Sequence, residues 1–212
     1  MNPRWEKLFR ERMSADSGDA FDPAHDILHI ERVVACAKTL ANAESASLDV
    51  VIPAAWLHDF VVVPKNDPRR AQASRLSAVA AVEYLRSIDY PAEFYDAIAH
   101  AIEAHSFSAA IDCRTIEARV VQDADRLDGL GAIGIARLFI TAGLMKRALY
   151  SADDPFCASR AADDSQFTID HVYRKLFVVA DTLKTEAGRA EGVRRREVLT
   201  RYLADLSREI AL

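Results

Sequence analysis

The most restrictive feature of this sequence is an almost wholly apolar segment, residues 50–60, which contains an adjacent pair of ionisable side chains. The segment reads Val-Val-Ile-Pro-Ala-Ala-Trp-Leu-His-Asp-Phe, so His58 and Asp59 lie in the most apolar part of the chain. A helix that is apolar on all sides is normally a central one, and Pro53 is early enough to start it. Because burying unpaired ionisable groups is costly, the segment predicts that this pair is either internally paired or bound to a metal.

The composition of the chain favours an all-α fold. Among 212 residues there are 37 alanines, the best helix formers, but only 7 glycines and 7 prolines, which break helices. The length suits one domain that buries a large core without a disulfide or metal to hold it together. We therefore expect residues 1–212 to form a single-domain helical bundle.

Hydrophobic periodicity and helix-breaking residues divide the chain into helices and loops. The expected helices cover about 3–14, 22–45, 50–60, 72–87, 91–105, 113–128, 130–149, 165–183 and 188–210. Asp22 is the expected N-cap of the second helix, with Pro23 in its first turn. Residues 61–71 are an expected loop, and the weakly patterned stretch 151–164 is an expected surface loop and a candidate lid. A C-terminal helix is expected within 188–212.

Charge and cysteine content limit the class of protein further. The net charge is −5 and the pI is near 5.7, which disfavours binding to duplex nucleic acid or to an anionic membrane. The three cysteines are far apart and form no Cys-x-x-Cys motif, which is typical of reduced thiols in a cytosol. No 18-residue apolar run is present, and the N-terminus lacks an apolar signal core. We expect a cytoplasmic protein with no membrane partner.

Histidines and aspartates are the residues most informative about chemistry. His25 and His29 are four apart in an expected helix, so they project from one face. Three carboxylates, those of Asp123, Asp125 and Asp128, enter one apolar helix and repel one another unless a cation compensates them. Neutral imidazoles with carboxylates and no thiolate suit a divalent ion such as Mn²⁺, Fe²⁺, Ni²⁺ or Zn²⁺. A site with two imidazoles and two carboxylates would leave coordination positions of the metal open for water and substrate, as catalytic metals require.

Four of these residues occur in a recognisable order: His29, then His58-Asp59, then Asp125. This His…His-Asp…Asp order resembles the signature of the HD-domain metal-dependent phosphohydrolases, so the chain is identified as a member of that superfamily. The similar segments are Ala-His-Asp-Ile-Leu-His-Ile-Glu-Arg-Val, Leu-His-Asp-Phe-Val-Val-Val-Pro-Lys-Asn-Asp-Pro, Ala-His-Ser-Phe-Ser, Val-Gln-Asp-Ala-Asp-Arg-Leu-Asp-Gly-Leu-Gly-Ala-Ile-Gly, Asp-Pro-Phe and Asp-His-Val-Tyr-Arg-Lys-Leu. They look like a small bacterial subgroup similar to the YedJ protein and span about residues 20–185.

The resemblance implies an HD-type helical bundle with a metal site between its central helices. The residues it assigns as metal ligands are His29, His58, Asp59 and Asp125. Asp123 and Asp128 are the alternatives to Asp125 as the fourth metal ligand. Asp128 lies on the same helical face as Asp125, where it could orient a ligand or the water. We expect one divalent ion per chain, which could be Mn, Fe, Ni, Mg or Zn.

The remaining histidines leave alternatives open. His100 and His105 are five apart, about 140° around a helix, so both can bind metal only if the helix ends between them. Ser106 and the polar run after it make such an end plausible. We favour one metal, with His105 contacting substrate or phosphate, over a second metal bound by either residue. His25 is expected to bind substrate or hold a ligand carboxylate, and His171 to be a packing or surface residue.

Basic residues near these motifs fit a phosphorylated substrate. Lys65 follows the His-Asp pair by six residues, and Arg69 and Arg70 follow in the same loop. Cations there would neutralise charge on a transferring phosphoryl group, and the alternative is that they are solvated loop charges. Lys175 is a second candidate for phosphate binding. Arg126 is expected to pair with a carboxylate instead.

The predicted function is hydrolysis of a small phosphorylated compound, expected to be a nucleotide, by a metal-activated water. Asp59 is the expected proton acceptor as well as a ligand. The other residues expected to take part in catalysis are Lys65, His105 and Asp128. The alternatives are a non-catalytic regulatory module that binds metal or nucleotide, and a di-iron oxygenase of the HD type. The oligomeric state expected is a monomer or a homodimer.

Overall fold

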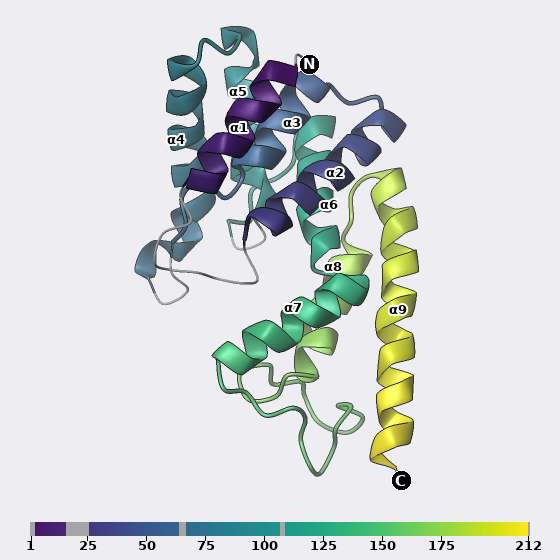
Figure 1. The fold of residues 1–212 in the computed structure, drawn as a ribbon. Helices are drawn as coiled ribbons and strands as arrows, with labels where there is room; N and C mark the ends of the chain where they lie inside the picture. Colours follow the sequence, from purple (N-terminus) through teal and green to yellow (C-terminus); the bar gives the residue numbers. More distant parts are fainter. Residues whose placement is uncertain (1–2, 16–25, 64–66, 107–108, 212) are drawn as a thin grey trace. The chain divides into compact units, whose positions relative to one another are not determined.

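The computed structural model describes residues 3–15, 26–63, 67–106 and 109–211 (Figure 1). Across these residues the chain is helical, and its β-type pairing is one isolated bridge between Ala148 and Phe167. Contacts divide the chain into two compact units, Met1–Asp125 and Arg126–Leu212. The expected all-α fold is therefore confirmed.

The first unit is built from α-helices joined by short 3₁₀ turns. Its helices are α1 (Pro3–Ala15), α2 (Ile27–Ala43), α3 (Leu48–Leu57), α4 (Ala73–Ser87) and α5 (Tyr95–His105), with η1 (Pro68–Gln72) and η2 (Ala92–Phe94) between them. Helix α6 (Ile116–Asp128) begins in this unit and continues into the second. Apart from the start of α2, the boundaries lie close to the ones that periodicity predicts.

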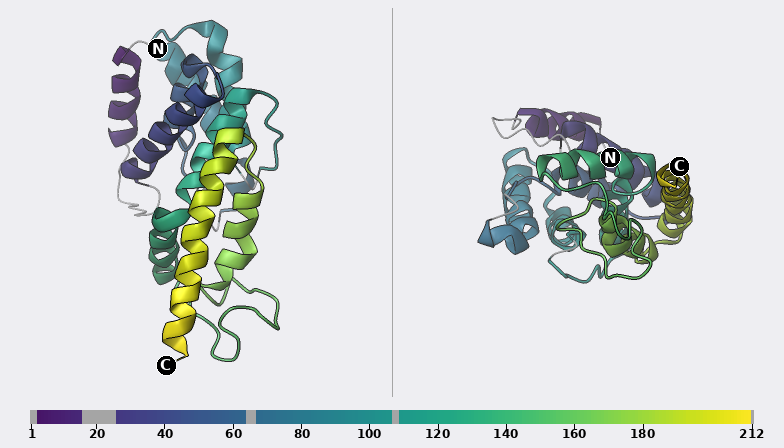
Figure 2. Two further views of the ribbon diagram at one scale, coloured as in Figure 1. Left: turned by 90° about the vertical axis from the view of Figure 1, so that its right-hand side faces the viewer. Right: turned by 90° about the horizontal axis from the view of Figure 1, so that it is seen from below.

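Helix α3 is the centre of the first unit. It packs against α1, α2, α4 and α5, which surround it in the views of Figures 1 and 2. Every residue from Val50 to Leu57 is buried. An apolar helix of this kind has no polar face to turn to water, so neighbours must cover it on all sides. The prediction that the apolar segment forms a central helix is confirmed, and it puts His58 and Asp59 at the end of the core helix.

The predicted start of this helix at Pro53 is wrong. Helix α3 begins at Leu48, after Ser47 in an extended conformation, so Pro53 lies inside the helix. Proline has no N–H to donate to the carbonyl four residues earlier, which belongs to Asp49. The hydroxyl of Tyr90 donates to that carbonyl at 2.7 Å instead. A distant tyrosine thus satisfies the acceptor that the proline leaves open.

Helix α2 begins at Ile27, later than predicted. Asp26 has an extended backbone, and its carboxylate accepts a hydrogen bond from the His29 N–H at 2.9 Å. Asp26 is therefore the N-cap. The expected cap Asp22 and Pro23 lie outside the described residues.

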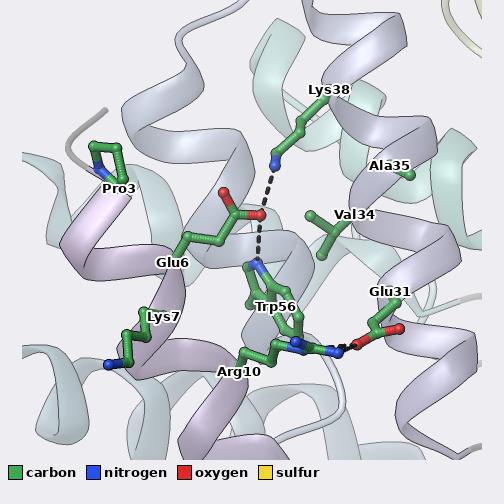
Figure 3. Close-up of a pocket in the computed structure, with 9 residues that line it drawn as sticks. All are labelled: Pro3, Glu6, Lys7, Arg10, Glu31, Val34, Ala35, Lys38 and Trp56. Atoms are coloured by element: carbon green, nitrogen blue, oxygen red, sulfur yellow. Dashed lines mark hydrogen bonds and ion pairs between the residues drawn. The ribbon is translucent and has the colours of Figure 1, made fainter.

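Helix α1 is attached to α2 and α3 by part-buried and exposed polar contacts (Figure 3). The Glu6 carboxylate accepts from Lys38 Nζ at 2.5 Å and from the Trp56 indole N–H at 3.4 Å. Arg10 donates to Glu31 at 2.8 Å. These residues line a groove of about 530 Å³. Because these acidic and basic side chains pair with one another, we interpret the groove as the place where α1 is held against α2 and α3. We do not interpret it as a ligand-binding site.

The second unit contains the end of α6 and a second group of helices. They are α7 (Gly131–Leu144), η3 (Val172–Leu176), α8 (Phe177–Asp181) and α9 (Glu186–Ile210). Helix α9 packs against α7 and α8 (Figure 2), and Arg195 on α9 donates to the Leu127 carbonyl at 2.6 Å. Gly131 begins α7 with φ +69°, a conformation that favours glycine.

Two helix boundaries in this unit differ from prediction. Helix α7 ends at Leu144 rather than near 149, and the helix expected over 165–183 begins only after Phe167. The backbone of Ala148 donates to Gln166 at 3.1 Å and accepts from Thr168 at 2.9 Å. Backbone groups paired between distant segments are not available to a helix, so neither predicted helix includes this pairing. Helix α7 already ends before it, where Lys146 has a positive φ of 54°.

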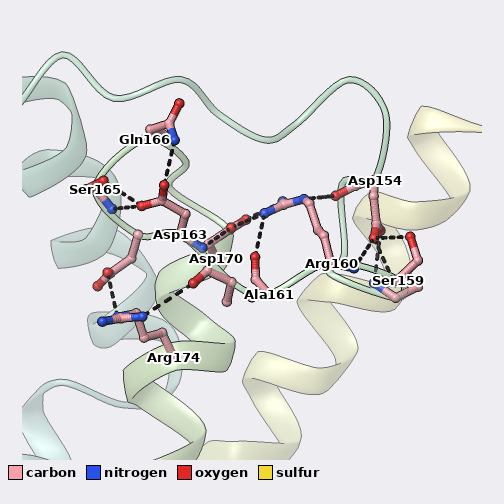
Figure 4. Close-up of polar contacts among 12 residues, drawn as sticks. Asp154, Ser159, Arg160, Ala161, Asp163, Ser165, Gln166, Asp170 and Arg174 are labelled. Atoms are coloured by element: carbon pink, nitrogen blue, oxygen red, sulfur yellow. Dashed lines mark hydrogen bonds and ion pairs between the residues drawn. The ribbon is translucent and has the colours of Figure 1, made fainter.

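The segment 151–164 contains no helix, as the sequence predicts, and polar contacts hold it in shape (Figure 4). Arg160 forms two hydrogen bonds with the buried carboxylate of Asp170, at 2.5 and 2.8 Å. The Asp154 carboxylate accepts from the backbone N–H groups of Ala158 and Ser159 at 2.9 and 2.8 Å. These contacts fix the loop to itself and to the following helical segment. A role as a lid stays a prediction.

No single described helix is both long enough and apolar enough to cross a membrane. The bent pair α6 and α7 passes that test only when the two are counted together, by length and composition alone.

We expect Tyr90→Phe to lower the free energy of unfolding by about 1–3 kcal/mol, because the Asp49 carbonyl loses its donor. In a Pro53→Ala background the alanine N–H supplies the missing helical donor, so the same replacement should cost less. Urea unfolding of the four proteins measures this coupling. Equal costs in both backgrounds would show that Tyr90 acts in some other way.

A second prediction concerns the loop carboxylate. The N–H groups of Ser159 and Ala158 lower the pKa of Asp154 from its ordinary value of 3.8 to about 2. Because this pKa is lower in the folded state, the stabilisation is complete above pH 4 and is lost as the pH falls toward 2. We expect Asp154→Asn to reduce the urea midpoint at pH 7 and to have little effect near pH 2. Asp153→Asn, at an exposed neighbour, is the control and should show no such trend.

Candidate metal centre

His58 is the C-cap of α3 and is completely buried. Its Nδ1 lies 2.8 Å from the Ala55 carbonyl, which can only accept, so Nδ1 carries the proton. Its Nε2 therefore offers a lone pair toward two carboxylates. It lies 3.5 Å from Asp59 Oδ2 and 3.9 Å from Asp125 Oδ1.

His105 is the last residue of α5 and repeats this arrangement. Its Nδ1 donates to the Ile102 carbonyl at 2.6 Å, three residues back, and its Nε2 lies 3.8 Å from Asp59 Oδ1. The rings of His58 and His105 are 4.9 Å apart and nearly perpendicular. Two helices thus end in a histidine that satisfies a carbonyl of its own last turn and presents Nε2 to the same carboxylate.

His29 and Asp125 complete the cluster. His29 lies in the first turn of α2, where the Asp26 cap fixes its backbone, and its ring is 5.5 Å from that of His58. Its Nε2 lies 3.6 Å from Asp125 Oδ1, on α6. Four helices of the first unit therefore contribute to one cluster.

The electrostatics keep these groups in the forms that bind metals. Burial lowers the pKa of His105, and the neighbouring His58 lowers it further, so the ring is neutral near pH 7. Burial by itself raises the pKa of Asp125, but the imidazoles of His58, His105 and His29 outweigh it and hold that pKa below its usual range. A neutral His105 ring and an ionised Asp125 carboxylate are therefore parts of the same cluster.

The donor atoms form two overlapping groups, each with all atoms within 4.8 Å of one another. They are His29, His58 and Asp125, and His58, Asp59 and His105. Imidazole and carboxylate are the donors that first-row divalent ions prefer, and a carbonyl bond at Nδ1 is the usual support of a metal-bound histidine. The residues therefore fit a divalent metal ion.

The two carboxylates face the open side of the cluster. The side chains of Asp59 and Asp125 are 38% and 28% exposed, whereas those of the three histidines are at most 7% exposed. A substrate or water would therefore approach from the carboxylate side. The structure thus brings together the four ligands expected from the sequence and adds His105, which the sequence analysis assigned to substrate, as a fifth candidate donor.

His100 is not placed to bind the same metal. Its Nε2 accepts the Arg114 backbone N–H at 3.0 Å, which occupies that lone pair. The helix ends after His105, where Ser106 is extended, and not between the two histidines. Of the pair, only His105 lies in a donor group.

Other predicted site residues have partners in the second unit or in loops. Asp128 pairs with Arg137 at 2.6 Å, and Arg126 donates to the Thr182 carbonyl at 3.3 Å. The expected pairing of Arg126 with a carboxylate stays a prediction. The Nδ1 of His171 lies 2.8 Å from Asp164, and Lys175 is exposed on the π turn of η3. Their expected roles toward substrate stay predictions.

The expected phosphate-binding loop is only partly described. Arg69 is exposed, and its guanidinium pairs with Asp67 at 2.8 Å. Lys65 and His25 lie outside the described residues, and Arg70 is described in its backbone only. Asp123, the rival to Asp125, is fully buried and is in neither donor group.

Comparison with known proteins agrees with this site. The sequence profile of the HD domain matches residues 27–130, the span that carries the candidate donors. The uncharacterized protein YpgQ of Bacillus subtilis (strain 168) is 31% identical over 190 residues, which cover 88% of this chain and 84% of YpgQ. The chain belongs to the HD-domain family, whose members bind divalent metals.

Solved structures agree in fold over almost the whole chain. The structure of Bacillus subtilis YpgQ in complex with ADP has a TM-score of 0.74 and 32% identity, and covers 97% of both chains. An HD-superfamily hydrolase from Bacillus thuringiensis has a TM-score of 0.73 and 25% identity, and covers 98% of this chain and 95% of its own. The protein thus has the fold of the HD-superfamily hydrolases. Membership of the YedJ-like subgroup stays a prediction.

We expect His58→Ala to weaken Mn²⁺ binding by at least ~10-fold, because His58 is in both donor groups and even outer-shell partners contribute that much. His100→Ala is the matched control and should retain the metal. Elemental analysis after Mn²⁺ loading, with calorimetric titration, measures stoichiometry and affinity. Unchanged binding by the His58 variant would contradict the assigned site.

Proposed function

We propose that this protein is a metal-dependent phosphohydrolase that acts on nucleotides. The observation that carries the proposal is the cluster of buried imidazoles with two part-exposed carboxylates on its open side. A closed structural site would have no open side for a substrate.

One ion per chain fits the donor geometry. His58 belongs to both donor groups, but its Nδ1 is bound to the Ala55 carbonyl, so only Nε2 is available. The single lone pair of Nε2 can bind one metal ion. We infer that His29, His58, Asp59 and Asp125 hold it, with His105 beside them toward the substrate.

A bound divalent ion would supply a water whose pKa is lowered toward neutrality. Asp59 is placed to accept the proton of the attacking water, because its side chain is 38% exposed and its two oxygens face His58 and His105 separately. The buried neutral ring of His105 offers its Nε2 on the same side of the cluster. The protein groups thus provide a proton acceptor and an orienting ring next to the place where phosphorus would lie.

The phosphate charges of the substrate need cations. We propose His25, Lys65 and Arg69 for this role, since they adjoin the His29 and His58-Asp59 motifs in sequence, with Lys175 as a further contact. Arg69 would have to leave Asp67 or bind substrate together with it. Asp128, paired with Arg137, is proposed to orient groups near Asp125 on the same helix.

The nucleotide assignment is supported by YpgQ, which was crystallised with ADP and resembles this chain along almost its full length. A nucleoside diphosphate combines the charged phosphates that such a metal site and its cations would recognise with a leaving group suited to hydrolysis. The proposed partner is accordingly a small phosphorylated molecule.

The test is a turnover assay with Mn²⁺ against nucleoside di- and triphosphates and simple phosphoesters. We expect Asp59→Asn to lower kcat by about 10²–10⁴-fold, the usual contribution of a positioned proton acceptor. His58→Ala should remove activity together with the metal, and His100→Ala should leave it nearly unchanged. No turnover of any phosphorylated compound by the wild-type protein would refute the proposed function.

A further inference from the structure

Gln122 is a buried polar residue on α6, one turn before Asp125 and only 2% exposed. Its Nε2 donates a hydrogen bond to the Ala104 carbonyl at 2.6 Å. A carbonyl can only accept, so the amide nitrogen must face Ala104. The amide oxygen is then left buried with no hydrogen bond among the described residues.

The bond to Ala104 lies at the end of α5, where helical carbonyls lack helical donors. Ser106 is extended, so the helix cannot continue and supply them. The Ile102 carbonyl is satisfied by the His105 ring and the Ala104 carbonyl by Gln122, both at 2.6 Å. Cys113 Sγ adds a longer contact to Ala104 at 3.7 Å. The last turn of α5 is therefore held from within by His105 and from α6 by Gln122.

We infer that Gln122 is a positioning residue that fixes the end of α5 so that His105 faces Asp59. Helix α6 then sets two parts of the site: it carries Asp125 directly, and it places His105 through Gln122. The inference rests on the proposed function for the role of His105.

Packing alone does not account for an amide at this position. A methionine would fill similar space and would leave no amide oxygen unsatisfied. An unsatisfied buried acceptor is unfavourable, so the amide is better explained by what its nitrogen does. That nitrogen bonds to the residue immediately before His105.

The experiment compares Gln122→Met and Gln122→Glu with Tyr84→Phe. Glutamate keeps the shape of glutamine, and its carboxyl group can donate to Ala104 when it is protonated, the form that burial favours, but not when it is ionised. Tyr84→Phe removes a similar bond, from the Tyr84 hydroxyl to the Leu8 carbonyl at 2.9 Å, elsewhere in the same unit. The readouts are kcat and KM with Mn²⁺, and the histidine ring nitrogen signals of the metal-free protein by NMR.

We expect Gln122→Met to lower kcat at least ~10-fold, with KM changed no more than ~2-fold. Gln122→Glu should lower kcat in this way only at a pH at which its carboxyl group is ionised. The His105 ring signals should shift while those of His100 do not, and Tyr84→Phe should change neither readout. Unmoved His105 signals in a folded Gln122→Met protein would overturn the inference, as would a Gln122→Met protein with the kcat of the wild type. Failure of both variants to fold would also overturn it, because Gln122 would then be a folding residue.

If the wild-type protein has no turnover, the proposed function fails, and the NMR signals of the metal-free protein still test the inference.

Discussion

The candidate site depends on one repeated interaction, the hydrogen bond from a histidine Nδ1 to the carbonyl three residues earlier. His58 makes it at the end of α3 and His105 at the end of α5. The same bond satisfies a helix-end acceptor and fixes the ring with Nε2 outward, so the helix ends and the donor set stabilise each other. A ring free to rotate could not present its lone pair to a shared carboxylate, and the overlap of the two donor groups would be lost.

The central burial of α3 explains why the donors can be packed so closely. Apolar side chains from Val50 to Leu57 exclude water on every side of the helix, and the helix delivers His58 into the core. In that environment a neutral His105 ring and an ionised Asp125 are the stable forms, since burial lowers the pKa of His105 and the neighbouring imidazoles lower that of Asp125. The energetic cost of grouping these side chains is one that a divalent cation would offset.

The sequence predicted most of the candidate donor residues but fewer of the residues that position the helices carrying them. Periodicity located the helices, and the order of His29, His58-Asp59 and Asp125 identified the family and the expected ligands. It did not identify Asp26 as the cap of α2, or Pro53 as an interior residue whose missing N–H is replaced by Tyr90. It also did not identify Gln122. Each of these depends on a contact whose partner local periodicity does not specify, and for Tyr90 and Gln122 that partner is distant in the chain.

The sequence by itself determined an all-α chain with a central apolar helix ending in His58-Asp59, because these properties follow from composition and local periodicity. It also determined the chemistry of the donors. Only the tertiary structure decided which histidine of His100 and His105 joins them: Arg114 occupies His100, while the end of α5 turns His105 toward Asp59. Both residues have the same chemistry and lie on one short helix, so only contacts with other parts of the chain could distinguish them.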